Sequence, residues 1–189
     1  MRRLDLIVGP NGAGKSTFVE LSLAPLLPGS VFVNADVIAR QRWRERAEEM
    51  SYEAAQVAAA VRDRFVAEGR SFIAETVFSH PSKLDLIDRA RAAGFTVVLH
   101  VMLVPEAMSV RRVAHRVVSG GHSVPEDKIR SRYRRLWPLV VEAIGRADQA
   151  TVYDTASGTP DPVARFAAGE PVGVIRWPVW APAVLTEVG

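Results

Sequence analysis

The sequence contains no cysteine and very little lysine. The absence of cysteine excludes disulfides, thiolate metal sites and a cysteine nucleophile, and it fits the cytoplasmic location that we expect. Three of the 24 basic residues are lysines, so 21 are arginines. Two interpretations stay open: a GC-rich genome favours arginine, or the arginines bind phosphate, whose oxygens match the arginine fork. The clustering of the arginines must decide between them.

Long hydrophobic runs are also missing. The longest, residues 95–105, includes His100 and is shorter than the roughly 20 residues that cross a bilayer. We interpret it as a buried strand and expect no membrane association. Arg2 and Arg3 precede an apolar stretch, as in a signal peptide, but Asp5 interrupts that stretch and no small-residue cleavage site follows. We therefore expect the N-terminus to form the first strand of the fold.

Strand-like and helix-like segments alternate along the chain. The patterns predict strands at residues 4–8, 31–33, 71–76, 95–104 and 150–153, and helices at residues 15–24, 37–69 (with a break near Ser51), 82–93, 106–119 and 126–145. This order predicts one α/β domain over residues 1–189, with a P-loop NTPase-type parallel sheet of about five strands and helices on both faces. The Pro- and Gly-rich tail, about residues 155–189, is expected to be irregular, with 172–177 as a candidate further strand.

A phosphate-binding loop is predicted at residues 9–16. They read Gly-Pro-Asn-Gly-Ala-Gly-Lys-Ser and match the pattern G-x-x-x-x-G-K-[ST] between a predicted strand and a predicted helix. Such a loop turns backbone N–H groups toward a β-phosphate, and the following helix adds its positive dipole end. Lys15 is expected to reach the β- and γ-phosphates of ATP, and Ser16 to bind Mg²⁺. The predicted nucleotide-binding residues are Gly9, Asn11, Gly12, Ala13, Gly14, Lys15, Ser16, Thr17 and Arg116.

Polar residues follow the second and third predicted strands. Because ligands of parallel α/β sheets bind at the carboxyl ends of strands, Asp36 and Glu75 should lie beside the phosphate loop. Asp36 is predicted to be the catalytic base for an acceptor hydroxyl; the alternative is an N-cap of the helix that begins at Val37. Glu75 and Thr76 are predicted to bind the acceptor, and Glu75 also Mg²⁺. The alternative for Glu75 is a solvent-facing strand end.

A basic cluster follows the fourth predicted strand: Arg111, Arg112, Arg116, Arg130, Arg132, Arg134 and Arg135. The two helices that carry it are joined by the Gly-Gly segment at 120–125, and we predict a helical lid, about residues 106–137, that brings arginine onto the γ-phosphoryl group. Arg112 and Arg116 share a helix face and are the predicted catalytic arginines. Arg132 and His122 are predicted to contact the acceptor, although His122 is equally well a plain loop residue. Most of the other arginines are expected to be solvated surface charges.

Other nucleotide-binding classes find no support in the sequence. No L-S-G-G-Q-like signature appears and no apolar run ends in Asp-Glu, which argues against a transporter-type ATPase. The guanine-reading pattern N-K-x-D is absent, which argues against a GTPase switch. No spacing typical of zinc ligands occurs.

Together, these segments resemble the zeta-toxin family of P-loop kinases over about residues 1–155. The matching segments are residues 9–17, 34–36, 75–79, 112–116, 120–126 and 150–154. The phosphate loop is shared by many families. The more specific features are Asp36 after the second strand, the Glu75-Thr76 pair and the Gly-Gly-His-x-Val-Pro segment.

The resemblance implies a kinase that transfers the γ-phosphate of ATP, with Mg²⁺, to an alcohol group. Characterised members phosphorylate the 3′-hydroxyl of UDP-N-acetylglucosamine, so a small nucleotide-sugar-like acceptor and an antitoxin protein partner are implied. It also implies Lys15 and Ser16 on ATP and Mg²⁺, Asp36 as base and Glu75 on the acceptor. Two alternatives stay open. One is a polynucleotide or nucleoside kinase, whose arginine-rich lid would follow nucleic-acid phosphates. The other is a nucleotide-gated binding module with incidental ATPase activity, against which Asp36 and Glu75 argue.

Overall fold

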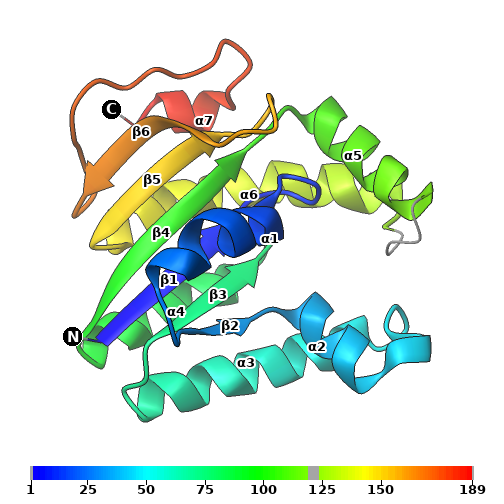
Figure 1. Cartoon of the computed structure of the whole chain (residues 1–189). Coiled ribbons are helices and arrows are strands. Elements are labelled where there is room, and N and C mark those ends of the chain that lie inside the picture. Colours follow the sequence, from blue (N-terminus) through cyan, green and yellow to red (C-terminus); the bar gives the residue numbers. More distant parts are fainter. Residues whose placement is uncertain (1, 119–123, 189) are drawn as a thin grey trace.

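The computed structural model describes residues 2–118 and 124–188, and these residues form one sheet flanked by helices (Figure 1). The sheet has seven strands in the order β2-β3-β1-β4-β5-β6-β7. Their bounds are β1 Arg2–Val8, β2 Val31–Val33, β3 Phe72–Thr76, β4 Phe95–Leu103, β5 Gln149–Asp154, β6 Asp161–Ala167 and β7 Glu170–Pro171.

The first five strands in this order are parallel to their neighbours, which confirms the predicted α/β fold with a mostly parallel sheet. Buried side chains alternate along the strands between the two faces, as the pleat requires. In β1, for example, Leu4 and Leu6 point into the larger core cluster, and Ile7 into the smaller one. All five carboxyl ends therefore meet at the same edge of the sheet, where the phosphate loop begins.

The expectation of about five strands was wrong, because the C-terminal tail adds two. β6 pairs antiparallel with β5, and β7 with β6. Pro162 near the start of β6 disfavours a strand assignment from sequence, yet at the start of a strand a missing N–H is tolerated. The predicted strand at 172–177 does not form. Its neighbour Pro171 has no N–H to donate and Gly173 has φ 77°, so the segment keeps only isolated hydrogen bonds to β6, from the N–H groups of Val172 and Arg176.

The described helices are α1 Lys15–Phe18, α2 Ala35–Arg42, α3 Ser51–Ala67, α4 Leu84–Ala92, α5 Glu106–Val118, α6 Glu126–Arg146 and α7 Ala183–Thr186. A π-helical segment, η1 Val19–Leu23, and three 3₁₀ turns, η2 Ala24–Leu26, η3 Arg44–Arg46 and η4 Pro81–Lys83, complete the helical elements. The break predicted near Ser51 is confirmed. The first helix, predicted to stop before Pro25, instead continues through η1 and η2 to Leu26, with Pro25 in the first turn of η2.

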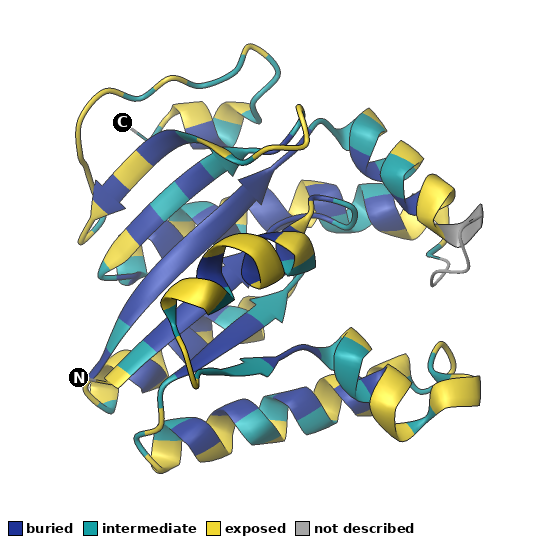
Figure 2. Cartoon of the chain, in the orientation of Figure 1, coloured by how far each residue is buried: buried dark blue, intermediate teal, exposed yellow. Residues whose placement is uncertain are grey.

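The two faces of the sheet are covered unequally. The larger core cluster forms where α3, α4, α6 and α7 pack on one face. The smaller cluster forms on the opposite face, beneath α1 and η1, with Phe18, Val19 and Leu23 against Ile7 and Met102. Figure 2 shows the helix over this second face with its outer side exposed and the strands beneath it buried.

Helices α5 and α6 extend beyond the carboxyl edge of the sheet (Figure 1). Only the first turns of α6 belong to this extension, because side chains from Tyr133 onward, such as Leu136 and Val140, are buried in the large core. The joining segment 119–123, with the predicted contact His122, lies outside the described residues. None of the helices in the described ranges is long and apolar enough to cross a membrane.

Candidate active site

The phosphate loop connects β1 to α1 and depends on glycine at defined positions. Gly9 has φ 150°, and a Cβ atom there would lie 2.6 Å from the carbonyl oxygen of Met102 on the neighbouring strand β4. Gly12 has φ 72°, in the left-handed region that favours glycine, and its Cβ would meet Ser109 and Arg112 of α5. The loop is thus held between β4 and α5, with the first turn of α1 opening from Gly14.

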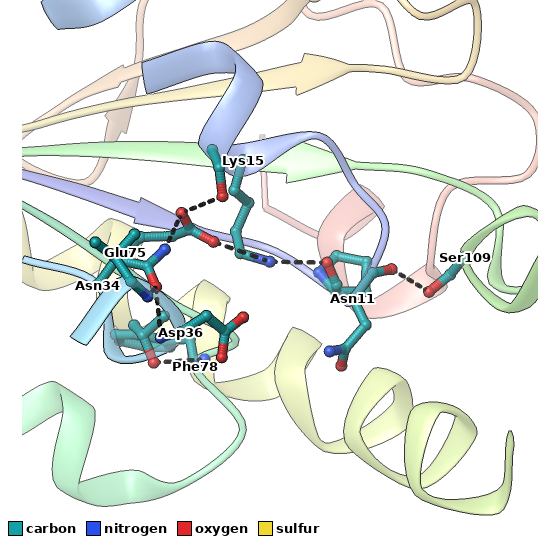
Figure 3. A network of polar contacts seen from close by, with 11 residues as sticks. Asn11, Lys15, Asn34, Asp36, Glu75, Phe78 and Ser109 are labelled. Carbon is teal, nitrogen blue, oxygen red and sulfur yellow. Dashed lines mark hydrogen bonds and ion pairs between the residues drawn. The ribbon is translucent and has the colours of Figure 1, made fainter. Parts of the chain in front are cut away.

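Lys15 is buried, with 7% of its surface exposed. Its Nζ donates a hydrogen bond to the Pro10 carbonyl oxygen at 3.0 Å and lies 3.9 Å from Glu75 Oε1 (Figure 3). Burial lowers the pKa of Lys15 below its ordinary value, and the nearby carboxylates of Glu75 and Asp36 oppose this effect. The ammonium group is therefore held under the loop, and the position matches the predicted role of a phosphate-binding lysine.

Glu75 joins three parts of the site. Its Oε2 accepts hydrogen bonds from Ser16 Oγ at 2.7 Å and from Asn34 Nδ2 at 2.6 Å (Figure 3). It stands at the end of β3 beside Ile7 of β1, so the parallel register brings it to the phosphate loop as predicted. The solvent-facing alternative is excluded, because the side chain is 10% exposed. Ser16 and Glu75 together offer hydroxyl and carboxylate oxygens, the ligand types that Mg²⁺ prefers.

The sequence analysis missed Asn34 as a site residue. Its Oδ1 accepts hydrogen bonds from the N–H groups of Asp36 and Val37, so Asn34, and not Asp36, caps α2. The N-cap alternative for Asp36 is therefore wrong, and the Asp36 side chain is exposed and lines the cavity described below. An asparagine directly after a strand and directly before a helical run is the signal that could have identified the cap.

Thr76 has a local role in this structure. Its Oγ1 accepts a hydrogen bond from the N–H of Phe78 at 3.3 Å, and Thr76 is not among the cavity-lining residues. Phe78 has φ 63° although it is not glycine, and its side chain is fully buried. Burial of the ring thus holds a strained backbone directly after Glu75 and Thr76.

The first turns of α5 are fastened to the phosphate loop. Ser109 Oγ donates to the carbonyl oxygen of Asn11. Arg112 donates to the carbonyl oxygens of Gly12, at 3.4 Å, and of Thr155 and Ala156, at 2.9 and 3.0 Å. The Arg112 guanidinium is therefore directed at backbone carbonyls of the phosphate loop and of the segment after β5, although it also borders the cavity. Ser109 was not predicted, because its partner is 98 residues away in sequence.

Of the two remaining arginines predicted to lie at the site, Arg116 lines the cavity and Arg132 does not. Arg116 lies one turn beyond Arg112, is exposed, lines the cavity and contributes to lowering the pKa of Lys15 by charge repulsion, after burial. Asn11, a predicted nucleotide contact, has a buried Oδ1 without a hydrogen-bond partner in the described part of the chain.

A cavity of about 840 Å³ brings these groups together, a size typical of small-molecule sites. One part is formed by the phosphate loop, α1 and Glu75, another by α5, and the third by α2 and the segment that follows it. Its lining residues are Gly12, Gly14, Lys15, Ser16, Thr17, Glu20, Asp36, Ala39, Arg40, Arg44, Glu45, Ala47, Glu48, Glu75, Arg112 and Arg116. No group of three or more carboxylate, imidazole or thiolate side chains that could hold a metal occurs within residues 2–118 and 124–188.

Comparison with known proteins places this arrangement in a family. The model of a family described as AAA domain matches residues 4–139, which contain the phosphate loop, Asp36, Glu75 and α5. The chain belongs to this family. The parallel sheet and its loop resemble in fold those of solved kinase structures. A comparison with curated protein sequences returned no match.

Solved structures share the fold of this AAA-domain chain at low sequence identity. The AvrRxo1-ORF1:-ORF2 complex with ATP has TM-score 0.70 at 19% identity over 91% of this chain, which spans only 60% of that one. The PezAT chromosomal toxin–antitoxin system of Streptococcus pneumoniae has TM-score 0.67 at 14% identity, over 99% of this chain and 78% of that one. A gluconokinase from Sinorhizobium meliloti 1021 has TM-score 0.52 at 19% identity, over 82% and 83%. The zeta-toxin-like fold is thus supported, together with that of small-molecule kinases.

Proposed function

We propose that this protein is an ATP-dependent kinase that transfers the γ-phosphoryl group to a hydroxyl of a small acceptor. The observation that carries the proposal is the position of Asp36. Asn34, and not Asp36, caps α2. The Asp36 side chain is exposed and lines the same cavity as Lys15 and Arg116. A binding module with incidental ATPase activity needs no carboxylate at this place, whereas a kinase needs a base for the acceptor.

The proposed reaction uses the site as follows. The loop N–H groups and Lys15 hold the phosphates of ATP. Mg²⁺, held by Ser16 and Glu75, would neutralise charge on the phosphate oxygens. Asp36 accepts the proton of the acceptor hydroxyl, whose oxygen forms a bond to the γ-phosphorus while the bond from that phosphorus to the β–γ bridging oxygen breaks, so that ADP leaves. Arg116 stabilises the charge that develops on the γ-phosphoryl group.

The proposal extends to the acceptor, the protein partner and the arginine that contacts the γ-phosphoryl group. A UDP-N-acetyl sugar is the first acceptor to test, since it is what the zeta-toxin resemblance implies. A protein antitoxin is the first partner to test, and the fold similarity to the PezAT toxin–antitoxin system supports that choice. We propose Arg116 for the γ-phosphoryl contact and a positioning role for Arg112, whose fork is directed at carbonyl oxygens.

The test is transfer of labelled γ-phosphate from ATP to a panel of UDP-sugars, free sugars, nucleosides and oligonucleotides. We expect a labelled small-molecule product that is lost in Lys15→Ala and Asp36→Asn. Transfer to oligonucleotide 5′ ends in preference to every small acceptor would overturn the small-molecule assignment. Normal ATP turnover by Lys15→Ala would overturn the assignment of the site itself.

A further inference from the structure

The segment from Arg40 to Arg46 carries four arginines that have different surroundings. Arg42 lies over the ring of Trp43, with its guanidinium carbon 5.4 Å from the ring centroid. Arg46 pairs with Glu49 at 2.8 Å. Arg40 and Arg44 instead line the cavity, and in the described part of the chain neither is in an ion pair. Two of the four cations are thus neutralised or stacked outside the cavity, and two line the cavity and form no ion pair within the described part of the chain.

The two cavity-facing arginines continue a row that starts at Asp36. Asp36 and Arg40 are four residues apart on α2, so they share a helix face and lie about 6 Å apart along it. Arg40 Nε contacts the Asp36 carbonyl oxygen at 3.3 Å, which places its side chain along that face. Arg44 follows beyond the end of α2 and lines the same cavity. The carboxylate of Asp36, the proposed base, is therefore followed along the chain by the guanidinium groups of Arg40 and Arg44, which line the same cavity at increasing distance from it.

Two small residues also line this side of the cavity. Ala39 and Ala47 line it together with Arg40 and Arg44. The acidic lining residues Glu45 and Glu48 lie on the same side, so the surface is of mixed charge and not a uniform basic stripe. A long nucleic-acid backbone would favour a continuous basic surface. A small molecule with hydroxyl groups and one anionic group fits a mixed surface better.

We infer that Arg40 and Arg44 form an anion-binding subsite for the acceptor, so that the acceptor is a hydroxyl compound that carries a phosphate, diphosphate or carboxylate group. The inference rests on the proposed kinase function and specifies the acceptor class. The anionic group sits about one to two helical turns, on the order of 6–12 Å, from the hydroxyl at Asp36. Arginine suits this task because its fork binds phosphate or carboxylate oxygens with two parallel hydrogen bonds.

The experiment compares acceptors with and without an anionic group: N-acetylglucosamine 1-phosphate with N-acetylglucosamine, uridine 5′-monophosphate with uridine, and gluconate with glucose. Binding of each to the full chain is measured in the presence of a non-hydrolysable ATP analogue, and phosphoryl transfer is measured with ATP. Arg40→Ala and Arg44→Ala are tested against the matched controls Arg42→Ala and Arg46→Ala, whose side chains lie outside the cavity lining.

We expect the anionic member of at least one pair to bind more tightly, by about tenfold or more, and to lose about 10- to 100-fold of that affinity in Arg40→Ala or Arg44→Ala. The affinity for the ATP analogue and the behaviour of Arg42→Ala and Arg46→Ala should not change. The phosphate-bearing pairs and the gluconate pair distinguish the two sources of the anion.

Equal binding of charged and neutral acceptors, or equal loss in the control variants, would overturn the inference, as would failure of every anionic compound to bind. Anion-selective binding that depends on Arg40 and Arg44 without any phosphoryl transfer would leave the subsite standing and contradict the kinase function instead. The two failures are therefore distinguishable.

Discussion

Glu75 shows how single residues connect this site. One carboxylate oxygen accepts hydrogen bonds from Ser16 and Asn34, and the other lies beside Lys15. Three chain segments that are far apart in sequence are thereby fixed to one another at the carboxyl edge of the sheet. Asn34 supplies both the contact to Glu75 and the cap of α2, so the side chain of Asp36 is not used as the cap of this helix.

Arg116 and Arg112 are predicted to differ in function although they lie one helical turn apart. Arg116→Ala should lower kcat for phosphoryl transfer by about 10³-fold or more, the scale expected when an arginine stabilises the transferred group. The affinity for ATP should change much less. Steady-state kinetics and equilibrium ATP binding provide the measurement, with Arg135→Ala, an exposed arginine of α6, as the control. An unchanged kcat in Arg116→Ala would make this residue a surface charge.

At the scale of elements, the first turns of α5 are attached to the phosphate loop. Ser109 and Arg112 fasten them to the phosphate loop and to the segment after β5. We therefore expect the predicted lid to move beyond Arg112, in the distal part of α5 and the first turns of α6. The second half of α6 is fixed in the core by Leu136 and Val140.

Arg112→Ala should loosen this attachment. We expect a loss of about 1.5–3 kcal/mol in the free energy of unfolding, because hydrogen bonds from a charged donor to partly buried carbonyls are removed. ATP should bind more weakly, since the loop carbonyl of Gly12 loses its partner. Urea unfolding and ATP titration of Arg112→Ala and of the exposed neighbour Arg111→Ala measure both effects. Wild-type stability and ATP affinity in Arg112→Ala would contradict the positioning role.

A buried polar network supports α1 on the other face of the sheet. Asp5 Oδ1 is 2.9 Å from His100 Nε2, and Asp5 also accepts two hydrogen bonds from Arg3 at 2.7 Å. The His100 ring contacts Phe18 of α1, with the ring centroids 5.4 Å apart. Burial alone would raise the pKa of Asp5, but the hydrogen bonds from His100 and Arg3 outweigh it and hold the pKa below its ordinary value.

This lowered pKa sets a pH dependence of stability. A carboxyl whose pKa is lower in the folded state stabilises the fold above its ordinary pKa, near 4, and loses that contribution as the pH falls through the folded-state value. Asp5→Asn should therefore lose about 1–3 kcal/mol of unfolding free energy at neutral pH and less in acid. Urea unfolding from pH 7 down to pH 3 measures the difference, with the exposed Asp161→Asn as control. A difference that grows on acidification would refute this assignment.

At the scale of the whole molecule, the features that could be predicted from the sequence are those that depend on residues close together in the chain. The phosphate loop and the alternation of strands and helices are local, so the parallel sheet and the positions of Lys15, Ser16 and Glu75 were predictable. β6 and β7 were not predictable, because β6 contains Pro162 and forms by pairing with β5, and the two-residue strand β7 forms by pairing with β6. The N-cap was assigned to Asp36 as an alternative because asparagine and aspartate both cap helices. The hydrogen bonds that Asn34 Oδ1 accepts from the N–H groups of Asp36 and Val37 distinguish them.

At this scale two groups of arginines can also be distinguished, those that form ion pairs and those that line the cavity. Several arginines outside the cavity pair with carboxylates on their own or neighbouring segments, among them Arg46, Arg64, Arg89, Arg91, Arg130 and Arg146. The arginines that line the cavity (Arg40, Arg44, Arg112 and Arg116) have no such ion pair in the described part of the chain. Of the four arginines at the cavity, Arg112 donates to backbone carbonyls, and we propose that the other three bind phosphate or carboxylate groups.

The central claim is that the site transfers a phosphoryl group to an acceptor and does not merely hydrolyse ATP. A single-turnover reaction with labelled γ-ATP, with and without the best acceptor, measures how the label divides between acceptor and inorganic phosphate. We predict that the wild-type chain places the label on the acceptor, while Asp36→Asn binds ATP normally and loses this transfer. Label that appears only in inorganic phosphate for every acceptor, or transfer that is unchanged in Asp36→Asn, would contradict the account.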